Sequence, residues 1–477
     1  MEYEIVIGLE VHAELATKSK IYCSCSTEYG GEPNTHCCPI CTGMPGVLPV
    51  LNEKVVEYAV KAGLATNCEI ARFSKQDRKN YFYPDLPKAF QTSQYDLPLC
   101  KNGHIDVELD GKTKRIGITR IHIEEDAAKL IHDEWNGGTM VDYNRCGVPL
   151  VEIVSEPDMR SAEEVRLYVE KLKAILEYTE VSDCKMQEGS LRADVNLSVR
   201  PFGQKEFGTR TEMKNINSFK AIVRAVEYEA KRQIEEIEEG GKITQETRRW
   251  DDNKGYSYSM RSKEEAHDYR YFPEPDIPPI VLSEEYIENL RKSLPELPHV
   301  RRLRYVEEFG LPEYDAEILT NSKYFADFFE KAVITGASPK LVSNWMMGDM
   351  SRLMKDKGLE PDQIPFEAIN LSKLIVLIEK GIISGTIAKK VFEKMFETGE
   401  DPEAIVKKEG LEVVSDEGAL KETVTKIIEA NPQSVADFKA GKAKAVGFLV
   451  GQAMKETKGK GNPQLLNKLI VEYLNQQ

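Results

Sequence analysis

Long apolar runs are missing from this sequence of 477 residues, and none approaches the ~20 residues that a membrane helix needs. A secretory leader is missing as well, because Met1 to Ile5 contain two glutamates and lead at once into a strand-like alternation. Cysteine is absent after Cys184. We therefore exclude the membrane and secreted classes and expect a cytoplasmic protein.

Three well-known catalytic motifs are also missing. The sequence has no G-x-x-x-x-G-K-[ST], which excludes a P-loop nucleotide site. It has no G-x-S-x-G nucleophile elbow and no H-E-x-x-H zinc motif. Internal repeats and low-complexity segments are absent too.

The composition is that of an ordinary globular protein, with 41% hydrophobic and 30% charged residues. Lys and Arg number 64 against 79 Asp and Glu, so the net charge is −15. An acidic chain argues against simple coating of a polyanion but leaves room for a local basic patch. The length predicts two to four domains at ~150 residues each.

The alternation of residue types predicts an α+β first part with a mostly antiparallel sheet. Strands are expected over residues 5–12, 115–123 and 191–200, and helices over 52–65, 161–179 and 218–239. Ser161 followed by Glu164 predicts a capping box. Prolines between 272 and 298 and turn signals near 399–412 mark boundaries. The predicted domains are 1–294, 295–407 and 408–477, and the last two are helical.

Five of the nine cysteines crowd into one segment. Cys23 and Cys25 form C-x-C, and Cys38 and Cys41 form C-x-x-C, which together suit a tetrahedral zinc ion. Four thiolates close the coordination shell, so such a site is structural. His36 or Cys37 could substitute for one ligand. The alternatives are reduced thiols without metal and a redox disulfide. The redox disulfide is the less favoured of these, because this C-x-x-C does not lie in a βαβ unit.

Carboxylates within apolar strands are the second signal. On the first strand Glu10, His12 and Glu14 lie opposite the apolar face. Glu125 alternates in step with the isoleucines before it, so its side chain is expected on their face of the strand. Glu152 is enclosed by apolar residues. A buried carboxylate needs a partner or a metal, and oxygen ligands with one imidazole suit Mg²⁺ or Mn²⁺. A solvated strand face or salt bridges are the alternative.

Two further patterns could serve phosphates and bases. One strand carries a polar face. This face could bind phosphate beside a metal ion, or it could simply be exposed to solvent. Its residues are Arg192, Asp194, Asn196, Ser198 and Arg200, continued by Arg210, Glu212 and Lys214. Arg, Lys and Tyr alternate in the blocks 75–85 and 268–276. Such blocks stack on bases or adenine, or pack as loops.

The C-terminal segment has a charge opposite to that of the whole chain. Residues 439–477 contain seven lysines and two glutamates, a net +5, so the remainder carries −20. Residues 442–455 are expected to form a helix with one apolar side. The lysines form either a solvated helical face or a phosphate-binding surface.

Several of these segments carry a resemblance to a known family. The matching motifs are Ile7 to His12, Asp77 to Pro87, Glu124 to Asp126, Ile153 to Asp158, Glu188 to Arg192, Asp268 to Asp276 and Gly447 to Gln452. In these motifs and over its whole length, the chain resembles the B subunit of the tRNA-dependent amidotransferase.

The resemblance implies a cradle-shaped catalytic domain, a helical domain and a small helical tail. It implies a heterotrimer with a glutaminase partner (the A subunit) and a small third partner (the C subunit), which converts Glu-tRNA(Gln) or Asp-tRNA(Asn) to the amide form. The B subunit of this family uses ATP and Mg²⁺ to phosphorylate the side-chain carboxylate. Ammonia released by the glutaminase partner then displaces the phosphate.

The resemblance also implies roles for particular residues. Glu10, His12, Glu125 and Glu152 are expected to hold Mg²⁺, with Glu124 near them. Arg192, Asp194 and Lys214 are expected to contact phosphate. Cys23, Cys25, Cys38 and Cys41 are expected to hold structural zinc, and the lysine-rich tail to contact tRNA.

Two rival hypotheses belong to other classes. One is a non-catalytic tRNA-binding scaffold with structural zinc, which has no need of buried carboxylates around a cation. The other is a free-standing ATP-dependent ligase, which would need no glutaminase partner.

Overall fold

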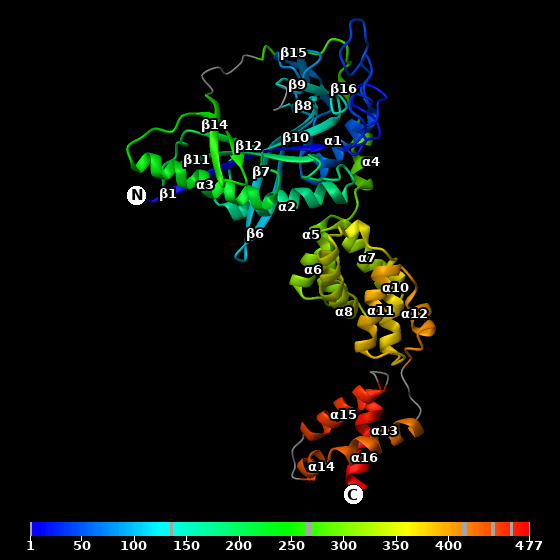
Figure 1. Ribbon diagram of the computed structural model, residues 1–477. Coiled ribbons are helices and arrows are strands. Elements are labelled where there is room, and N and C mark those ends of the chain that lie inside the picture. Colours follow the sequence, from blue (N-terminus) through cyan, green and yellow to red (C-terminus); the bar gives the residue numbers. More distant parts are fainter. Residues whose placement is uncertain are drawn as a thin grey trace. The chain divides into compact units, whose positions relative to one another are not determined.

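The computed structural model describes residues 2–133, 137–262, 269–412, 417–439, 444–457 and 461–476 (Figure 1). The chain divides into two compact units, Met1–Pro298 and His299–Gln477. The finer division into domains 1–294, 295–407 and 408–477 stays a prediction. Within the described residues, no helix is long and apolar enough to cross a membrane.

The first unit is built on a nine-stranded sheet with the strand order β14-β13-β12-β11-β1-β10-β7-β6-β2. Its strands are β1 (Tyr3–Glu14), β2 (Glu69–Ile70), β6 (Cys100–Leu109), β7 (Lys112–Glu125), β10 (Pro149–Ser155), β11 (Leu191–Pro201), β12 (Thr211–Lys214), β13 (Glu246–Asp251) and β14 (Tyr256–Ser262). Neighbouring strands are antiparallel except for the parallel pair β12 and β13. The predicted mostly antiparallel α+β fold is confirmed.

One face of this sheet is apolar and is covered by helices. Ile7, Leu9 and Val11 of β1 are fully buried in one core with residues of the helices. The covering helices are α1 (Glu53–Ala65), α2 (Ala162–Tyr178) and α3 (Phe219–Glu238), and α4 (Glu284–Ser293) packs against α1 (Figure 1). The alternation along β1 then puts Glu10, His12 and Glu14 on the opposite, polar face.

The predicted helices form where their capping residues lie. The side chains of Asn52, Ser161 and Ser218 each accept a backbone N–H from the first turn of α1, α2 and α3. In α2 the Ser161 hydroxyl accepts from the Glu164 N–H at 3.1 Å. The Glu164 carboxylate accepts from the N–H of Arg160, not of Ser161, so only one half of the predicted capping box forms.

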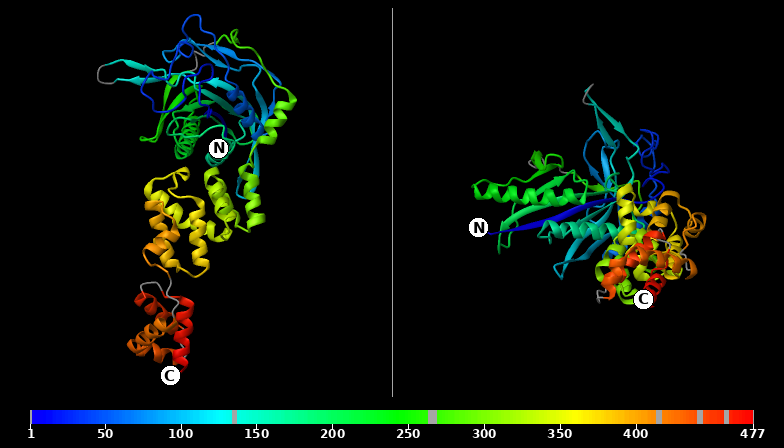
Figure 2. Two further views of the ribbon diagram at one scale, coloured as in Figure 1. Left: turned by 90° about the vertical axis from the view of Figure 1, so that its right-hand side faces the viewer. Right: turned by 60° about the horizontal axis from the view of Figure 1, so that its bottom comes forward.

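Small sheets adjoin the large one. β4 (Asp77–Asn80) pairs with both β5 (Phe90–Ser93) and β15 (Phe272–Pro273), and β3 (Phe73–Ser74) pairs with β16 (Ile280–Val281). β8 (Lys129–His132) and β9 (Thr139–Asp142) form a hairpin that extends from the unit (Figure 2). The proline-rich segment around 272–281 therefore supplies two short edge strands to the first unit.

The described part of the second unit is helical, as predicted. Its helices are α5 (Pro298–Phe309), α6 (Glu313–Thr320), α7 (Lys323–Ile334), α8 (Pro339–Trp345), the π-helix η2 (Met346–Met350), α9 (Ser351–Lys357), the 3₁₀ helix η3 (Pro361–Gln363), α10 (Ala368–Glu379), α11 (Gly385–Thr398), α12 (Pro402–Lys408), α13 (Glu417–Ala430), α14 (Pro432–Lys439), α15 (Lys444–Glu456) and α16 (Pro463–Gln476).

The last helices share an apolar cluster of their own. Leu420 and Val424 of α13, Leu449 of α15, and Leu466 and Ile470 of α16 are buried together in it. The helix predicted over 442–455 corresponds to α15 (Lys444–Glu456). Four of the predicted tail lysines are described and exposed, namely Lys439, Lys444, Lys455 and Lys468. The predicted contacts of Lys442, Lys458 and Lys460 lie outside the described residues.

Candidate functional site

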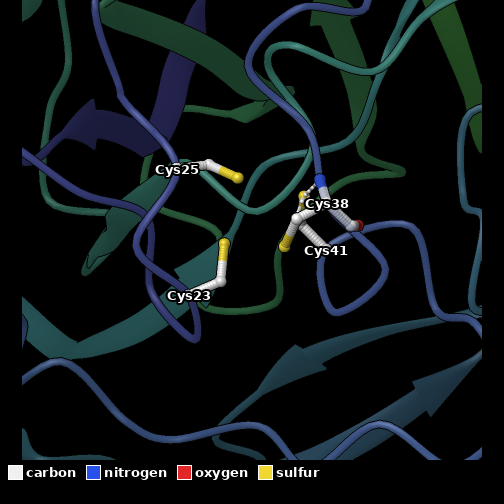
Figure 3. A group of neighbouring side chains, drawn as sticks. All are labelled: Cys23, Cys25, Cys38 and Cys41. Atoms are coloured by element: carbon white, nitrogen blue, oxygen red, sulfur yellow. Dashed lines mark hydrogen bonds between the residues drawn. The ribbon is translucent and has the colours of Figure 1, made fainter.

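Four cysteines that lie up to 18 positions apart in the sequence meet at one point. The sulfur atoms of Cys23, Cys25, Cys38 and Cys41 all lie within 4.8 Å of one another and point toward a common centre (Figure 3). Zinc bound tetrahedrally at about 2.3 Å separates its sulfur ligands by about 3.7 Å. This thiol cluster therefore has the number, type and spacing of ligands that a structural zinc ion needs.

The surroundings of the thiol cluster favour a thiolate at Cys41, whereas the hydrogen bond to Cys41 and burial raise the pKa of Cys23, and burial raises that of Cys25 to about 11. The Nζ of the fully buried Lys20 lies 3.7 Å from Cys41 Sγ, and the Cys38 N–H donates to the same sulfur at 3.2 Å. The hydrogen bond from Cys23, together with these two contacts, lowers the pKa of Cys41 to about 5. Cys37 is outside the cluster, since its thiol donates to the Asn34 carbonyl at 3.2 Å. His36 does not belong to the thiol cluster either, as far as the described residues show.

A second group of ligands lies on the polar face of the sheet. His12 of β1, Glu124 of β7 and Glu152 of β10 offer ligand atoms that lie within 4.8 Å of one another. His12 Nε2 is 3.2 Å from Glu152 Oε2 and 3.8 Å from Glu124 Oε2. We call these three residues the carboxylate cluster. Their mixture of oxygen and imidazole ligands suits a hard divalent cation such as Mg²⁺ or Mn²⁺.

The strand register brings this cluster together. His12 is opposite Glu152 in the pairing of β1 with β10, and Glu152 is opposite His122 in the pairing of β10 with β7. Glu124 is two residues beyond His122 and therefore projects from the same face. Three neighbouring strands fix the ligands, so the cluster does not depend on a loop.

Basic groups surround the two carboxylates. His122 Nε2 lies 3.6 Å from an oxygen of Glu124 and 3.6 Å from an oxygen of Glu152. Arg120 Nη2 lies 3.9 Å from Glu152. Burial alone would lower the pKa of Lys79, but the charges of Glu124 and Glu152 raise it above its usual value. Lys79 is therefore a cation held beside the cluster.

These neighbours keep both carboxylates ionised. Burial raises the pKa of Glu152, but the charge of His122 and the hydrogen bond from His12 outweigh it and hold the pKa well below its usual range. The pKa of Glu124 is lowered in the same way, against both burial and the charge of Glu152, by His122 and Lys79. The cluster thus holds two ionised carboxylates in a buried position, and an ionised carboxylate is the form that can bind a divalent cation.

Glu125 is not part of this cluster. Its place on β7 differs from that of Glu124 by one residue, so its side chain projects from the other face. There its Oε1 accepts from the Thr92 N–H at 2.9 Å and pairs with Lys88 Nζ. It lines a cavity of about 220 Å³ together with Lys20 and Cys41. The geometry favours Glu124 over Glu125 as a ligand beside His12.

Glu10 lies next to the carboxylate cluster on the same face of β1. Its Oε1 accepts from Asn196 Nδ2 at 3.1 Å. Burial, followed by the charges of Glu152 and Glu212, raises its pKa. The structure therefore places Glu10 beside the cluster, but its ligand atoms are not among those that converge there.

The polar face predicted on β11 is present, and most of its charges are paired. Arg192 Nη2 lies 3.1 Å from Asp126 Oδ2, and Arg145 Nε lies 2.6 Å from the same oxygen. Lys214 Nζ lies 2.6 Å from Asp194 and 3.1 Å from Glu212. These pairs give the face both signs of charge, and their roles as phosphate contacts stay predictions.

The two aromatic-basic blocks pack against one another. Phe272 is opposite Arg78 in the pairing of β15 with β4, and Arg78 forms an ion pair with Glu274 at 2.6 Å. The rings of Tyr81 and Tyr269 meet edge to face at 5.7 Å. This is the loop packing weighed as an alternative to base stacking. The same packing holds Lys79 beside the carboxylate cluster. Asp268, at the start of the second block, lies outside the described residues.

The sequence analysis missed His122 and Lys79. His122 could have been found from alternation, since it lies opposite the apolar parity of Ile121 and Ile123, as His12 lies opposite that of Leu9 and Val11. The same argument selects Glu124 over Glu125. Lys79 lies within one of the aromatic-basic blocks, but no local pattern sets it apart from the basic residues beside it.

The comparisons with known proteins cover the whole chain. A family model described as "GatB/GatE catalytic domain" matches residues 5–288, and one described as "GatB domain" matches residues 327–474. A chain of Caldicellulosiruptor bescii, named as the B subunit of aspartyl/glutamyl-tRNA(Asn/Gln) amidotransferase, is 68% identical over 477 residues, 99% of each chain. A chain of Thermoanaerobacter pseudethanolicus with the same name is 64% identical over 475 residues, 100% of each chain.

The sheet unit with its polar face is thus the catalytic domain of an amidotransferase, and the chain is part of an enzyme. More particularly, the chain belongs to the GatB family, the B subunits of these amidotransferases. The resemblance noted in the sequence is confirmed.

Proposed function

We propose that this chain phosphorylates the side-chain carboxylate of a misacylated Glu-tRNA(Gln) or Asp-tRNA(Asn) with ATP and then converts it to the amide. The observation that supports this most is the carboxylate cluster, which joins two ionised glutamates and a histidine on the polar face of the sheet. The names of the similar chains point to the same aminoacyl-tRNA substrates.

The chemistry requires activation because a carboxylate is a poor electrophile. A carboxylate oxygen attacks the γ-phosphorus of ATP, the bond from that phosphorus to the β-γ bridging oxygen breaks, and ADP leaves. Ammonia then attacks the carbonyl carbon of the acyl phosphate, the C–O bond to phosphate breaks, and phosphate leaves while the nitrogen loses a proton. In both steps negative charge is concentrated at the reacting phosphate group, and the protein must neutralise it.

We assign His12, Glu124 and Glu152 to hold Mg²⁺, which when bound neutralises charge on the phosphate oxygens. Lys79 and Arg120 lie beside these carboxylates and offer positive charge to the transferred phosphoryl group. Glu10 keeps the neighbouring polar groups in place through Asn196. Arg192 and Lys214 are further candidates for phosphate contacts. To bind phosphate, each would exchange its present carboxylate partner for a phosphate oxygen.

The remaining parts have supporting roles in this proposal. The thiol cluster holds structural Zn²⁺, because four thiolates leave no coordination position open. The lysine-bearing helices α14 to α16 contact the tRNA body. Ammonia comes from a glutaminase partner, the A subunit, and the small C subunit completes a cytoplasmic heterotrimer.

The test uses the assembled complex with each misacylated tRNA in turn. We expect ADP to form only when ATP, Mg²⁺ and misacylated tRNA are present, and an acyl phosphate to accumulate when glutamine is withheld. A complex that binds tRNA but hydrolyses no ATP, with Glu152→Gln as active as wild type, would support the scaffold hypothesis instead. Amidation by this chain alone, with glutamine as donor, would support the free-standing ligase.

A further inference from the structure

Lys20 is a charged residue of the first unit that the proposed mechanism does not use. Its side chain is fully buried and is among the largest side chains buried to that extent. Lysine almost never occupies such a position without a partner for its charge. Within the described residues, Lys20 forms no ion pair with a carboxylate, and Glu125, which lines the same cavity, is paired with Lys88. Another kind of group must therefore offset the positive charge of Lys20.

The ammonium group of Lys20 has two polar contacts. Its Nζ donates to the Tyr143 carbonyl oxygen at 3.2 Å and lies 3.7 Å from Cys41 Sγ. A Cβ on Gly147 would lie 3.7 Å from Lys20 Cδ and 3.5 Å from Cys41 Cβ, so both side chains pack against this glycine. A carbonyl dipole solvates an ammonium group but does not neutralise it, whereas a thiolate does both. The sulfur of Cys41 is therefore the negative partner within reach of Lys20.

Cys41 is also the ligand of the thiol cluster that most needs donors from the protein. It is buried, whereas Cys23, Cys25 and Cys38 are partly exposed. Water can solvate a charged sulfur at the surface, but a buried one depends on protein donors. Cys41 Sγ has two of them, the Lys20 ammonium group and the Cys38 backbone N–H at 3.2 Å. The donors are thus gathered at the sulfur that water reaches least.

The charge of a metal-loaded thiol cluster complements that of Lys20. Four thiolates and one Zn²⁺ carry a net charge of −2, and a partly buried site of this charge is costly without a cation nearby. Lys20 reduces the total to −1. Without metal and with protonated thiols, Lys20 would itself be a buried cation without an anion. The charge of Lys20 and the metal-bound state of the cluster therefore favour one another.

The second contact of Lys20 ties the cluster to the rest of the first unit. Tyr143, whose carbonyl group accepts from Lys20, begins the segment 143–147 that precedes β10. The same segment holds the cluster at another point, where the Cys146 thiol donates to the Cys41 carbonyl oxygen at 3.2 Å. Lys20 thus joins the thiolate of Cys41 to the backbone of a neighbouring segment.

We propose that Lys20 is a positioning residue of the zinc site, whose ammonium group donates to the Cys41 thiolate and offsets the charge of the four-thiolate shell. It thereby sets how tightly the cluster retains zinc. This inference rests on the proposed function, in which the thiol cluster holds Zn²⁺. The alternative is that Lys20 only fills space with its aliphatic stem, and an uncharged side chain of similar length would then serve equally well.

The first test compares two variants of the full-length chain. Lys20→Met keeps much of the length and volume and removes the charge, and Lys18→Met removes an exposed lysine two residues away as the matched control. Zinc affinity is measured by competition with a chelating dye. We expect Lys20→Met to weaken zinc binding by about tenfold or more, as loss of a group that supports a metal ligand does, and Lys18→Met to stay within about twofold.

Two negative outcomes of this test have different meanings. A wild-type chain that binds no zinc shows that the zinc assignment in the proposed function is wrong. A wild-type chain that binds zinc, together with a folded Lys20→Met variant of equal affinity, overturns the inference about Lys20 alone.

Cobalt bound in place of zinc gives a readout that packing by itself would not change. The ammonium group stabilises the lone pairs of Cys41, so its removal should make charge transfer from thiolate to Co²⁺ easier. We expect the charge-transfer absorption of Lys20→Met to move to lower energy and that of Lys18→Met to match wild type. An unmoved band in Lys20→Met would contradict the contact with Cys41.

Should Lys20→Met not fold, the wild-type chain provides the test. Lysine amines are acylated and located by mass spectrometry, with zinc bound and after its removal by a chelator. Lys20 should resist acylation with zinc bound and react without it, whereas the exposed Lys18 should react in both states. Lys20 as reactive as Lys18 with zinc bound, or equally protected after zinc removal, overturns the inference.

Discussion

The thiol cluster and the carboxylate cluster differ in what holds their ligands in place. The four cysteines come from one irregular segment, which contains an isolated bridge between Ser19 and Ser26. His12, Glu124 and Glu152 come from three neighbouring strands whose backbone hydrogen bonds set their positions. A metal at the first site would hold together a segment without regular structure, whereas strand pairing by itself fixes the positions of the residues at the second site.

This difference assigns different kinds of work to the two sites. A closed shell of four thiolates stabilises a loop and leaves no position for a substrate. A preformed pair of carboxylates with one imidazole leaves most of a cation's coordination sphere to water or phosphate. Removing a ligand should therefore cost folding at the thiol cluster and chemistry at the carboxylate cluster.

The largest expected effect comes from Glu152→Gln. Loss of this charge removes several kcal/mol of stabilisation from the transferred phosphoryl group, so ATP-dependent amidation should fall by about 10³-fold or more. The melting temperature should stay near that of wild type, because the sheet sets the position of the side chain. Glu108→Gln, an exposed carboxylate on β6, is the matched control and should retain full activity. A Glu152→Gln complex with wild-type kcat and Mg²⁺ dependence would contradict the assignment.

The second prediction concerns Cys38→Ser. Structural zinc contributes its binding free energy to folding, so we expect the bound zinc to be lost and the melting temperature to fall by roughly 10 °C. Elemental analysis and calorimetry measure the two quantities. Cys37→Ser, whose thiol lies outside the cluster, should keep the zinc. If Cys38→Ser retained a full equivalent of zinc, the ligand set would be wrong.

The third prediction compares the adjacent residues Glu124 and Glu125. Glu124→Gln should raise the Mg²⁺ concentration for half-maximal activity by about tenfold or more. Glu125→Gln leaves the half-buried Lys88 partly unpaired, so it should lower the melting temperature and leave the Mg²⁺ dependence unchanged. Titration of activity with Mg²⁺ distinguishes the two, and the reverse pattern would restore Glu125 as the ligand.

The smallest expected effect is that of the C-terminal helices. Deleting the residues from Gly410 onward removes the separate apolar cluster of α13 to α16 and should raise the KM for aminoacyl-tRNA several-fold, with kcat retained at saturating substrate. Each lysine contact to phosphate that is lost should reduce the slope of log affinity against log salt by about one. Unchanged affinity and salt slope in the truncated complex would show that these helices do not contact tRNA.

Much of the fold was predictable because local patterns and tertiary packing agree in it. The alternation along β1 predicted both faces of the sheet, and the capping signal at Ser161 predicted where α2 begins. The thiol cluster was predictable from spacing alone, because its ligands are close in sequence.

The carboxylate cluster was harder to predict because its ligands lie on strands far apart in the sequence. His12 and Glu152 were identified as candidates, but strand register decides which residues of a third strand join them. Strand parity, applied to β7 as to β1, places Glu124 and not Glu125 on the face that carries His12, and the ligand role of either residue stays a prediction.

The order of strands in the sheet has a consequence for the way the protein forms during synthesis. β1 is the first element made, yet its neighbours are β10 and β11, which follow about 140 and 180 residues later. Until Pro201 has left the ribosome, β1 lacks at least one of its two lateral partners, and its apolar alternation can pair with other chains. The carboxylate cluster cannot assemble before residue 155 is available to the sheet. The catalytic face is therefore completed late, and β1 stays open to pairing with other chains until its neighbours are made.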